Sequence, residues 1–248
     1  MRTSENTVLI TGGSSGIGLE LARALVTRGN SVIVCGRSES RLADAKAAMP
    51  ELKTITCDVG TDDGRALLLQ TVKETSPRLN VLVNNAGIML ALDFKTPNQH
   101  TAQQARSEVE IDFLAPILLS LAFIPMLAEQ RESAIVNLGS ILGYVPYAGT
   151  PVYSAAKAGI HSFSAALRFQ LAGTPIRVFE VAPPAVDTAL MNGFNFPKIP
   201  PARVASEIVK GLAANRWEIR IGMTNMAYMA SRLSPGMTER FVNGKRGP

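Results

Sequence analysis

The feature that most restricts the fold of this chain is a glycine-rich turn near its start. The apolar run Val8-Leu9-Ile10 leads directly into TGGSSGIG at residues 11–18, and a helix-favouring segment follows. Glycines allow a tight strand-to-helix turn and let backbone N–H groups approach a phosphate, while the helix N-terminus adds partial positive charge. Strand, turn and helix in this order predict a nucleotide-binding site, with a tight loop that binds nothing as the alternative.

Short apolar runs and helix-length segments alternate along the rest of the chain. Strands are expected at residues 7–11, 31–35, 53–57, 80–84, 134–138, 176–181 and 218–221. Helices are expected at residues 17–28, 40–48, 65–74, 104–130, 152–171 and 204–213. Continuous apolar runs suit strands covered on both faces, as in a parallel sheet. The alternation predicts an α/β fold, a Rossmann-type doubly wound parallel sheet, and in the absence of repeats or linkers we expect a single domain over residues 1–248.

Composition excludes several other classes. A chain with 46% hydrophobic and 18% charged residues is not intrinsically disordered. The net charge is +5, but Lys and Arg are scattered, so we expect no nucleic-acid partner. With two cysteines and two histidines on separate segments we expect no metal site, and Cys35 and Cys57 are expected to be buried, reduced thiols. The longest uncharged run, residues 113–128, is shorter than the ~20 apolar residues of a membrane span, and no signal-peptide pattern is visible. We therefore expect no membrane partner and a cytoplasmic location.

A second constellation lies on the helix expected at residues 152–171. Tyr153 and Lys157 are four residues apart, so a helix places them on one face. Ser140 lies 13 residues before Tyr153, just past the strand expected at residues 134–138. The four-residue spacing of Tyr153 and Lys157 occurs often by chance. It indicates a catalytic set only in combination with the glycine-rich turn.

Together these segments resemble the short-chain dehydrogenase/reductase family. The turn has the spacing Gly12-x-x-x-Gly16-x-Gly18. Further matches are Cys57-Asp58-Val59, Asn84-Asn85-Ala86-Gly87, the set Ser140, Tyr153 and Lys157, and Pro183-Pro184 followed by Val186-Asp187-Thr188. The matches extend over residues 7–188. Residues 1–95 further resemble the DltE-like branch, oxidoreductases named for the lipoteichoic-acid D-alanylation operon.

The resemblance implies an NAD(P)-dependent oxidoreductase that interconverts an alcohol and a ketone or aldehyde by hydride transfer, with Tyr153 as acid/base. The residues expected to contact the cofactor are Gly12, Ser14, Ser15, Gly16, Ile17, Gly18, Arg37, Asp58, Val59, Asn85, Ala86, Gly87, Tyr153, Lys157, Pro183, Val186 and Thr188. Pro184 stands where the family usually has glycine, which stiffens that loop. For residues 84–87, a polar turn that merely closes a strand is the alternative.

The residue types of the catalytic set suit proton transfer. A free tyrosine has a pKa near 10, and a nearby ammonium favours the phenolate and lowers that pKa. Lys157 is expected to supply this charge and, as in the family, to bond the nicotinamide ribose. The Ser140 hydroxyl is expected to bond the substrate oxygen and place it against Tyr153.

Cofactor choice is indicated by the end of the second expected strand. An acidic residue about 20 positions beyond the glycine turn usually binds the ribose 2′-hydroxyl of NAD. Residues 35–38 occupy this place, with no carboxylate before Glu39. Arg37 is able to pair with a 2′-phosphate, aided by the hydroxyls of Ser14 and Ser15, so we expect NADP(H) to be favoured over NAD(H). An arginine that is merely solvated is the alternative.

Asp112 departs from the family's pattern, which has asparagine at this position. A carboxylate near Lys157 is expected to offset the lysine's charge and leave the pKa of Tyr153 higher than in asparagine-bearing relatives. Pro116 has no N–H, so the Asp112 carbonyl loses its helical partner and is free to bind a water that serves the lysine. Two alternatives remain. Asp112 points into a helix interface and touches nothing catalytic, or the chain is a catalytically impaired nucleotide-binding scaffold or sensor of the same fold.

The expected partners are a small-molecule substrate and further copies of the chain. Residues 187–200 are expected to form a substrate loop whose apolar side chains, with Leu142, Tyr144 and Tyr147, favour an apolar carbonyl or alcohol substrate; a subunit contact is the alternative. By the resemblance, the apolar run at residues 113–128 indicates a homodimer or homotetramer; a helix that only packs in the core is the alternative.

The remaining residues of note receive no catalytic role. His161 is expected to serve helix packing or a subunit contact, and His100 to be solvated. No function is assigned to the Met-rich tail after Ile221, which ends in Lys245 and Arg246.

Overall fold

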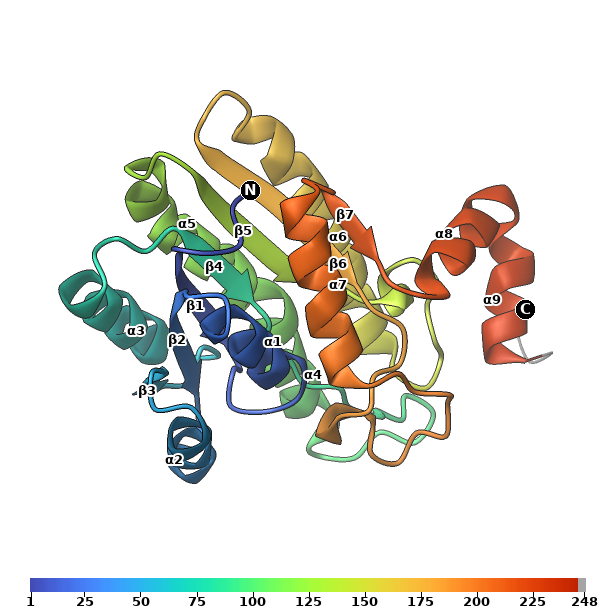
Figure 1. Cartoon of the computed structure of the whole chain (residues 1–248). Coiled ribbons are helices and arrows are strands. Elements are labelled where there is room, and N and C mark those ends of the chain that lie inside the picture. Colours follow the sequence, from blue (N-terminus) through green and yellow to red (C-terminus); the bar gives the residue numbers. More distant parts are fainter. Residues whose placement is uncertain (245–248) are drawn as a thin grey trace.

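Seven parallel strands pair in the order β3-β2-β1-β4-β5-β6-β7 in the part of the chain that the computed structural model describes, residues 1–244 (Figure 1). The strands are β1 (Thr7–Thr11), β2 (Ser31–Gly36), β3 (Lys53–Thr56), β4 (Val81–Asn84), β5 (Ser133–Leu138), β6 (Ile176–Ala182) and β7 (Glu218–Arg220). This is the predicted doubly wound Rossmann-type sheet, and each strand lies within one residue of its predicted bounds. Residues 245–248 of the predicted domain, with Lys245 and Arg246 of the tail, lie outside the described residues.

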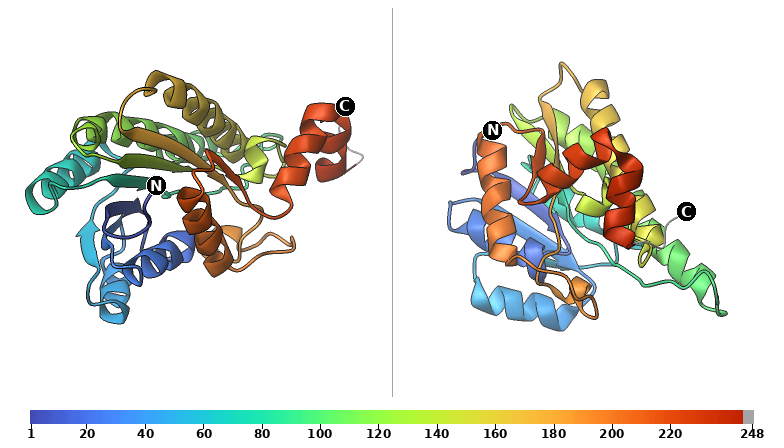
Figure 2. Two further views of the ribbon diagram at one scale, coloured as in Figure 1. Left: turned by 45° about the horizontal axis from the view of Figure 1, so that its top comes forward. Right: turned by 90° about the vertical axis from the view of Figure 1, so that its right-hand side faces the viewer.

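Helices cover both faces of this sheet (Figure 2). They are α1 (Gly16–Val26), α2 (Glu39–Ala48), α3 (Asp62–Thr75), α4 (Thr101–Val109), α5 (Ala115–Ala128), α6 (Pro151–Gln170) and α7 (Pro201–Ala213). Alternate strand residues point to opposite faces, so Val8 and Ile10 pack in one core cluster with α1, α2 and α7. Leu9 packs in the other cluster, with α3, α5 and α6. The two clusters explain why the strand sequences are continuously apolar.

The long helix expected at residues 104–130 is divided by a π-helical segment, η1 (Glu110–Leu114), between α4 and α5. Pro116 follows at the start of α5, and its missing N–H prevents an ordinary helical bond to the carbonyl of Asp112. Such π-turns inside helices are frequent at functional sites. Here the π-turn carries Asp112.

One helical stretch in the described residues, Thr101–Ala128, is long and apolar enough to cross a membrane by length and composition. Half of its most apolar window is buried inside the fold. Leu119 and Phe123 on α5 pack in the core beneath the sheet. The buried half of the stretch belongs to the core, while Leu114 and Leu121 are exposed.

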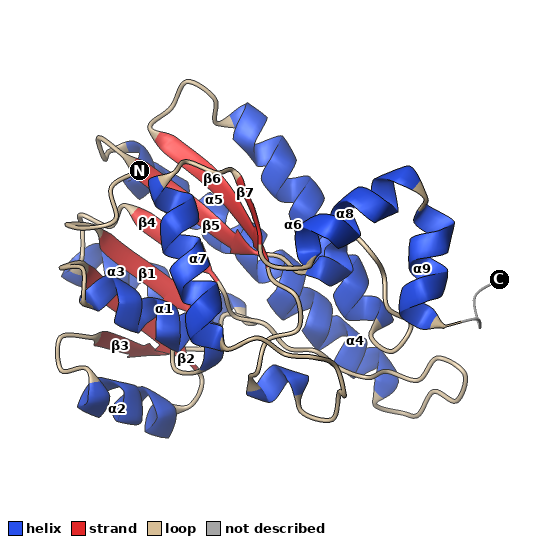
Figure 3. Ribbon diagram, turned by 45° about the vertical axis from the view of Figure 1, so that its right-hand side comes forward, coloured by secondary structure: helices blue, strands red, loops and turns tan. Residues whose placement is uncertain are grey.

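The tail after β7 forms two helices that the sequence pattern does not predict, α8 (Thr224–Leu233) and α9 (Pro235–Asn243). They stand at one side of the sheet, away from its two helical layers (Figures 1 and 3). Asn243 holds α9 to the body of the fold, because its amide donates to the Pro146 carbonyl and accepts the Ala148 N–H.

Candidate active site

A cavity of ≈ 760 Å³ lies beyond the carboxyl ends of the strands. Its lining comes from the β1–α1 turn and from segments that follow β2, β3, β4, β5 and β6. Ligands of open α/β sheets bind in this position. The sequence-predicted site residues that line it are Gly12, Ser14, Ser15, Gly16, Ile17, Arg37, Asp58, Val59, Asn85, Ala86, Gly87, Asp112, Tyr153, Lys157, Pro183 and Thr188.

Three sequence-predicted residues, Gly18, Ser140 and Val186, are not part of this lining. Gly18 lies inside α1, where a Cβ atom would come within 2.5 Å of Asn85 Nδ2, so glycine permits the close packing of α1. Val186 is buried and forms a β-bridge with Ile199. Ser140 lies beside Tyr153.

The glycine turn is shaped as an anion cradle. Gly12 and Gly16 have φ angles of +64° and +55°, a left-handed conformation that L side chains rarely adopt. Ser15 precedes α1 in an extended conformation, and its side chain caps no backbone N–H of the helix. The first turn of α1 therefore presents backbone N–H groups that no cap satisfies, beside the cavity. These features fit the pyrophosphate of a dinucleotide.

The segment after β4 is tied to this turn. The hydroxyl of Thr11 accepts the N–H groups of Asn85 and Ala86, each at 3.0 Å. The Asn85 side-chain amide donates to the Thr11 carbonyl at 2.8 Å. A Cβ atom on Gly87 would lie 2.7 Å from Asp112 Oδ1, so glycine lets η1 approach the loop. The segment after β4 is thus bonded to the end of β1 and lines the cavity, so it is more than a turn that closes a strand.

Two arginines line the end of the cavity next to β2. Arg37 Nη1 lies 3.9 Å from Asp58 Oδ2, a long, solvent-exposed ion pair. Arg41, four residues later on α2, also lines the cavity. Sequence reasoning missed Arg41, although its i+4 spacing from Arg37 was a usable signal.

Tyr153 and Lys157 lie together on α6, and both side chains are buried. Lys157 Nζ lies 5.3 Å from the centroid of the Tyr153 ring. It also donates to the Leu138 carbonyl at 3.0 Å, which fixes the ammonium against the end of β5. Tyr153 and Lys157 therefore lie on one face of α6, as their four-residue spacing predicts.

Ser140 caps the short helix η2 (Ile141–Gly143), where its hydroxyl accepts the Leu142 N–H at 3.1 Å. Burial raises the pKa of Tyr153 above its usual value, and the charge of Asp112 adds to this rise. Lys157 and a hydrogen bond with Ser140 lower that pKa but do not outweigh the burial. Lys157 thus lowers the pKa of Tyr153 as expected, but the expected net lowering is wrong, because burial outweighs the lysine.

Asp112 reaches the lysine directly. Its Oδ1 lies 3.0 Å from Lys157 Nζ, and its Oδ2 accepts the Ile88 N–H at 3.0 Å. Burial lowers the pKa of Lys157, but Asp112, Tyr153 and Glu108 together hold that pKa above its usual value. Asp112 is itself fully buried, and burial raises its pKa against the opposing effect of the lysine. The alternative in which Asp112 touches nothing catalytic does not describe this geometry.

The predicted substrate loop contributes to the cavity through Ala189, Leu190 and Asn192. Further along the loop, Phe196 packs edge-on against Tyr147, with ring centroids 5.4 Å apart. Tyr144 does not join them: its ring packs between those of His161 and Tyr228. The expected cluster of Leu142, Tyr144 and Tyr147 at the pocket is thus wrong, since none of the three lines the cavity.

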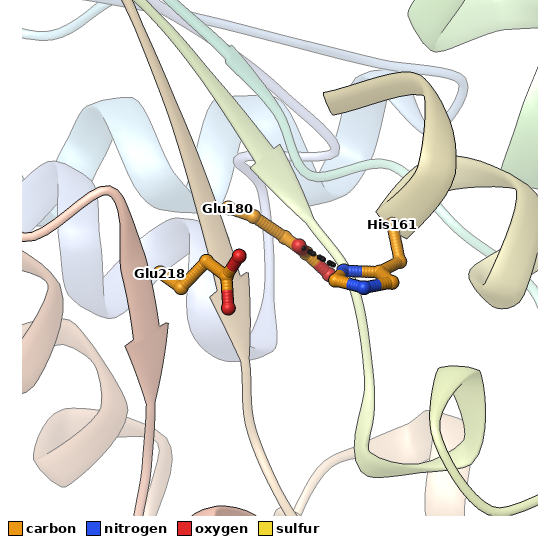
Figure 4. A group of neighbouring side chains, drawn as sticks. All are labelled: His161, Glu180 and Glu218. Atoms are coloured by element: carbon orange, nitrogen blue, oxygen red, sulfur yellow. Dashed lines mark hydrogen bonds and ion pairs between the residues drawn. The ribbon is translucent and has the colours of Figure 1, made fainter. Parts of the chain in front are cut away.

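His161 belongs to a separate polar cluster (Figure 4). Its Nδ1 lies 2.7 Å from Glu180 Oε2, and Glu218 brings a third potential ligand atom, all within 4.8 Å of one another. The sequence placed these residues on separate elements and gave no signal of the grouping. Glu218 is already paired with Arg220 and lies 3.9 Å from Arg168 Nη1. These arginines neutralise the carboxylate, so the group is an ion-pair network that joins α6, β6 and β7.

Comparison with known proteins supports the same reading of fold and motifs. A family model described as short chain dehydrogenase matches residues 6–197. The uncharacterized oxidoreductase DltE of Bacillus subtilis is 50% identical to this chain over 190 residues, which cover 77% of this chain and 75% of that protein.

Two solved structures share the fold. A short chain dehydrogenase from Burkholderia cenocepacia in complex with NADP has a TM-score of 0.87 and 23% identity, with all of both chains covered. A short chain dehydrogenase/reductase from Burkholderia phymatum in complex with NAD has a TM-score of 0.85 and 19% identity, covering 100% of this chain and 99% of that one. The same fold thus accompanies either dinucleotide in these neighbours.

Proposed function

This chain belongs to the short-chain dehydrogenase family, and we propose that it interconverts an alcohol and a ketone or aldehyde, with Tyr153 as the acid/base. The observation that carries the proposal is one shared cavity. The glycine turn and the Tyr153–Lys157 pair line the same space, with Ser140 beside the tyrosine. The resemblance to the family and to its DltE-like branch is confirmed by the comparisons.

The residues around the cavity fit a nicotinamide dinucleotide. The uncapped first turn of α1 and the positive-φ glycines would hold the pyrophosphate, and Asp58 and Val59 would bracket the adenine. Val186 and Thr188 follow β6 and, by the resemblance to the family, would hold the nicotinamide carboxamide; of the two, Thr188 lines the cavity. When bound, the nicotinamide supplies or accepts the hydride.

The protein's own contribution is to hold the substrate oxygen and to move one proton. Burial keeps Tyr153 protonated near neutral pH, so its hydroxyl is a ready proton donor to the oxygen of a carbonyl. The Lys157 ammonium opposes the negative charge that the phenolate then carries, and the Leu138 carbonyl keeps that ammonium in place. Ser140 would hydrogen-bond the substrate oxygen and orient it toward Tyr153.

Three finer assignments belong to the same proposal. NADP(H) is favoured over NAD(H), because Arg37 and Arg41 offer two guanidinium groups to a 2′-phosphate. The substrate is apolar, because Met89, Leu90 and Leu190 line the cavity. The enzyme works in the cytoplasm as a homodimer or homotetramer, and the free cysteines suit a reducing compartment.

The test is oxidation of NADPH, followed by its fluorescence, in the presence of a panel of ketones and aldehydes. We expect turnover with at least one apolar carbonyl compound, and turnover slower by about 10²–10⁴-fold in the matched Tyr153→Phe variant. A second panel tests alcohols with NADP⁺. If the chain binds NADPH but neither panel gives turnover, the result would instead support a nucleotide-binding scaffold or sensor. The observation that favours this second function is the ion pair of Asp112 with Lys157, because it offsets the charge of the lysine.

A further inference from the structure

A second carboxyl group lies beside Asp112 in the protein interior. Glu108 precedes Asp112 by four residues, at the end of α4, and both side chains are completely buried. Residues four apart on a helix lie on one face. Neither motif matching nor spacing singled out Glu108, because a glutamate in a helix of this polarity is ordinarily solvent-exposed.

The two carboxyl groups hold the same loop. Glu108 Oε1 accepts the Leu90 N–H at 2.8 Å, and Asp112 Oδ2 accepts the Ile88 N–H at 3.0 Å. This loop continues directly from Gly87 and lines the cavity. The pair therefore sets the position of the wall next to the catalytic groups.

Each carboxyl group has one further oxygen. Asp112 Oδ1 faces Lys157 Nζ at 3.0 Å. Glu108 Oε2 is buried and has no hydrogen-bond partner among residues 1–244. A buried carboxylate oxygen without a partner is costly when ionised, whereas a protonated carboxyl avoids much of that cost.

The charges around Glu108 limit its ionisation. The groups that act on it electrostatically are Asp112 on the same helix and Lys157 on α6. Lys157 and Asp112 already form a pair of zero net charge, so a second carboxylate would leave a net charge of minus one in the interior. Burial raises the pKa of Glu108 most strongly and the charge of Asp112 adds to the rise, while the Leu90 N–H and Lys157 oppose it; together these effects place the pKa at about 7.

We propose that Glu108 is a positioning residue whose buried carboxyl group sets the net charge of the Asp112–Lys157–Tyr153 cluster and so biases the enzyme toward carbonyl reduction. The proposal rests on the function proposed above. When Glu108 is ionised, its charge opposes the phenolate form of Tyr153, and the tyrosine remains a proton donor. Alcohol oxidation needs the phenolate as base, so it is disfavoured until a higher pH.

The first experiment detects the proton on Glu108 itself and needs no substrate. Infrared difference spectra of the full chain are recorded from about pH 5 to about pH 9, and the C=O stretch of a buried protonated carboxyl is followed. In the wild type this band should vanish with a midpoint near pH 7. It should be absent in Glu108→Gln, which keeps an oxygen for the Leu90 N–H, and unchanged in the matched control Glu110→Gln on the neighbouring turn.

The Asp112→Asn variant provides a second, independent arm. Because the charge of Asp112 raises the pKa of Glu108, its removal should move the midpoint of the same band to lower pH. This arm also stands if Glu108→Gln does not fold. If the band persists in Glu108→Gln, or if its midpoint is the same in Asp112→Asn as in the wild type, Glu108 is not the titrating group.

The second experiment measures the consequence at Tyr153. The ultraviolet absorbance of its phenolate is titrated in the wild type and in Glu108→Gln, with Tyr153→Phe spectra subtracted to remove the other tyrosines. The phenolate should form at lower pH in Glu108→Gln, by up to about one pH unit. Identical titrations would refute the coupling.

Kinetics then separate the inference from the proposed function. For the best carbonyl compound of the panel and its alcohol, the acid limb of oxidation in Glu108→Gln should move to lower pH, while the KM for NADPH stays unchanged. A shift of one unit corresponds to about a tenfold faster oxidation below the limb. If the spectra behave as expected but no compound turns over, the charge assignment holds and the proposed reaction fails.

Discussion

At the scale of single residues, the Lys157 ammonium beside Tyr153 is not an isolated charge, because it forms an ion pair with Asp112. The carboxylate of Asp112 lies 3.0 Å from Lys157 Nζ, so part of the positive charge that would stabilise the Tyr153 phenolate is neutralised. Burial acts in the same direction and raises the pKa of Tyr153. A donor role for Tyr153 follows more directly from this arrangement than a role as base.

Replacement of Tyr153 by phenylalanine tests the donor. Tyr153→Phe should lower kcat by about 10²–10⁴-fold, because it removes the proton donor, while the Kd of NADPH stays within a few-fold. Lys157→Ala should harm both kcat and NADPH binding, since the lysine is expected to serve both. Steady-state kinetics and fluorescence titration measure the two effects. Full activity in Tyr153→Phe would contradict the assignment.

Replacement of Asp112 by asparagine tests the electrostatic effect of the carboxylate. Asp112 raises the pKa of Tyr153, so in Asp112→Asn the basic limb of the pH–rate profile of reduction should move to lower pH. Asparagine keeps an oxygen for the Ile88 N–H, so the fold should persist. The readout is the pH dependence of kcat/KM. Superimposable profiles would exclude the effect, and an inactive wild type revived by this change would favour the scaffold.

Cofactor preference should depend on two arginines. Arg37→Ala and Arg41→Ala should each weaken NADPH binding by about tenfold, because each removes a charged partner of the 2′-phosphate. NADH binding should hardly change. Arg28→Ala, at a residue outside the cavity lining, is the matched control. Kd values from fluorescence titration decide the matter, and a tenfold preference of the wild type for NADH would contradict the proposal.

At the scale of elements, an ion-pair network joins α6 to β6. The hydrogen bond to Glu180 raises the pKa of His161 above 6.5 in the folded chain. Because the folded-state pKa is the higher one, the stabilisation is complete below pH 6.5 and is lost as the pH rises through the folded-state pKa.

A histidine replacement should reveal this pH dependence. His161→Gln should lower the free energy of unfolding by about 1 kcal/mol at pH values below 6.5, and by less at alkaline pH. Urea denaturation at several pH values measures the difference between the two proteins. A difference independent of pH would show that the protonated histidine contributes no stability.

The π-turn η1 is the second element that matters for the site. Glu110–Leu114 departs from the regular helix directly before Pro116 and places Asp112 against both Lys157 and the loop after β4. Proline was visible in the sequence, but the π-turn was not predicted, since the lost bond could equally have produced a kink. The choice between the two is made by what the helix packs against.

At the scale of the whole molecule, exposed apolar side chains on the α4–α5 segment are consistent with the proposed oligomer. Leu114 and Leu121 are exposed there, whereas Leu119 and Phe123 of α5 are buried in the core. If this segment is the subunit contact, Leu121→Arg should shift the protein to a smaller species, because it places a charge in an apolar interface. Light scattering after size-exclusion chromatography gives the mass. A wild-type monomer would refute the proposed assembly.

The sequence by itself determined the elements and the motifs. Strand and helix patterns are local, so seven strands were predicted to within a residue, and the glycine turn and the Tyr153–Lys157 spacing pointed to one cavity. The helices α8 and α9 were not predicted, because they lack the buried apolar face that makes a helix recognisable; Thr224 is the only buried residue that either contains.

Only the tertiary structure decided the electrostatics of the site. The contact of Asp112 with Lys157, the complete burial of Glu108 and the grouping of His161 with Glu180 each join segments distant in sequence. A pKa depends on burial and on neighbouring charges, and neither exists before the chain is folded. The direction of the Tyr153 pKa was therefore predicted wrongly from the lysine alone, because the burial that outweighs the lysine is a property of the assembled fold.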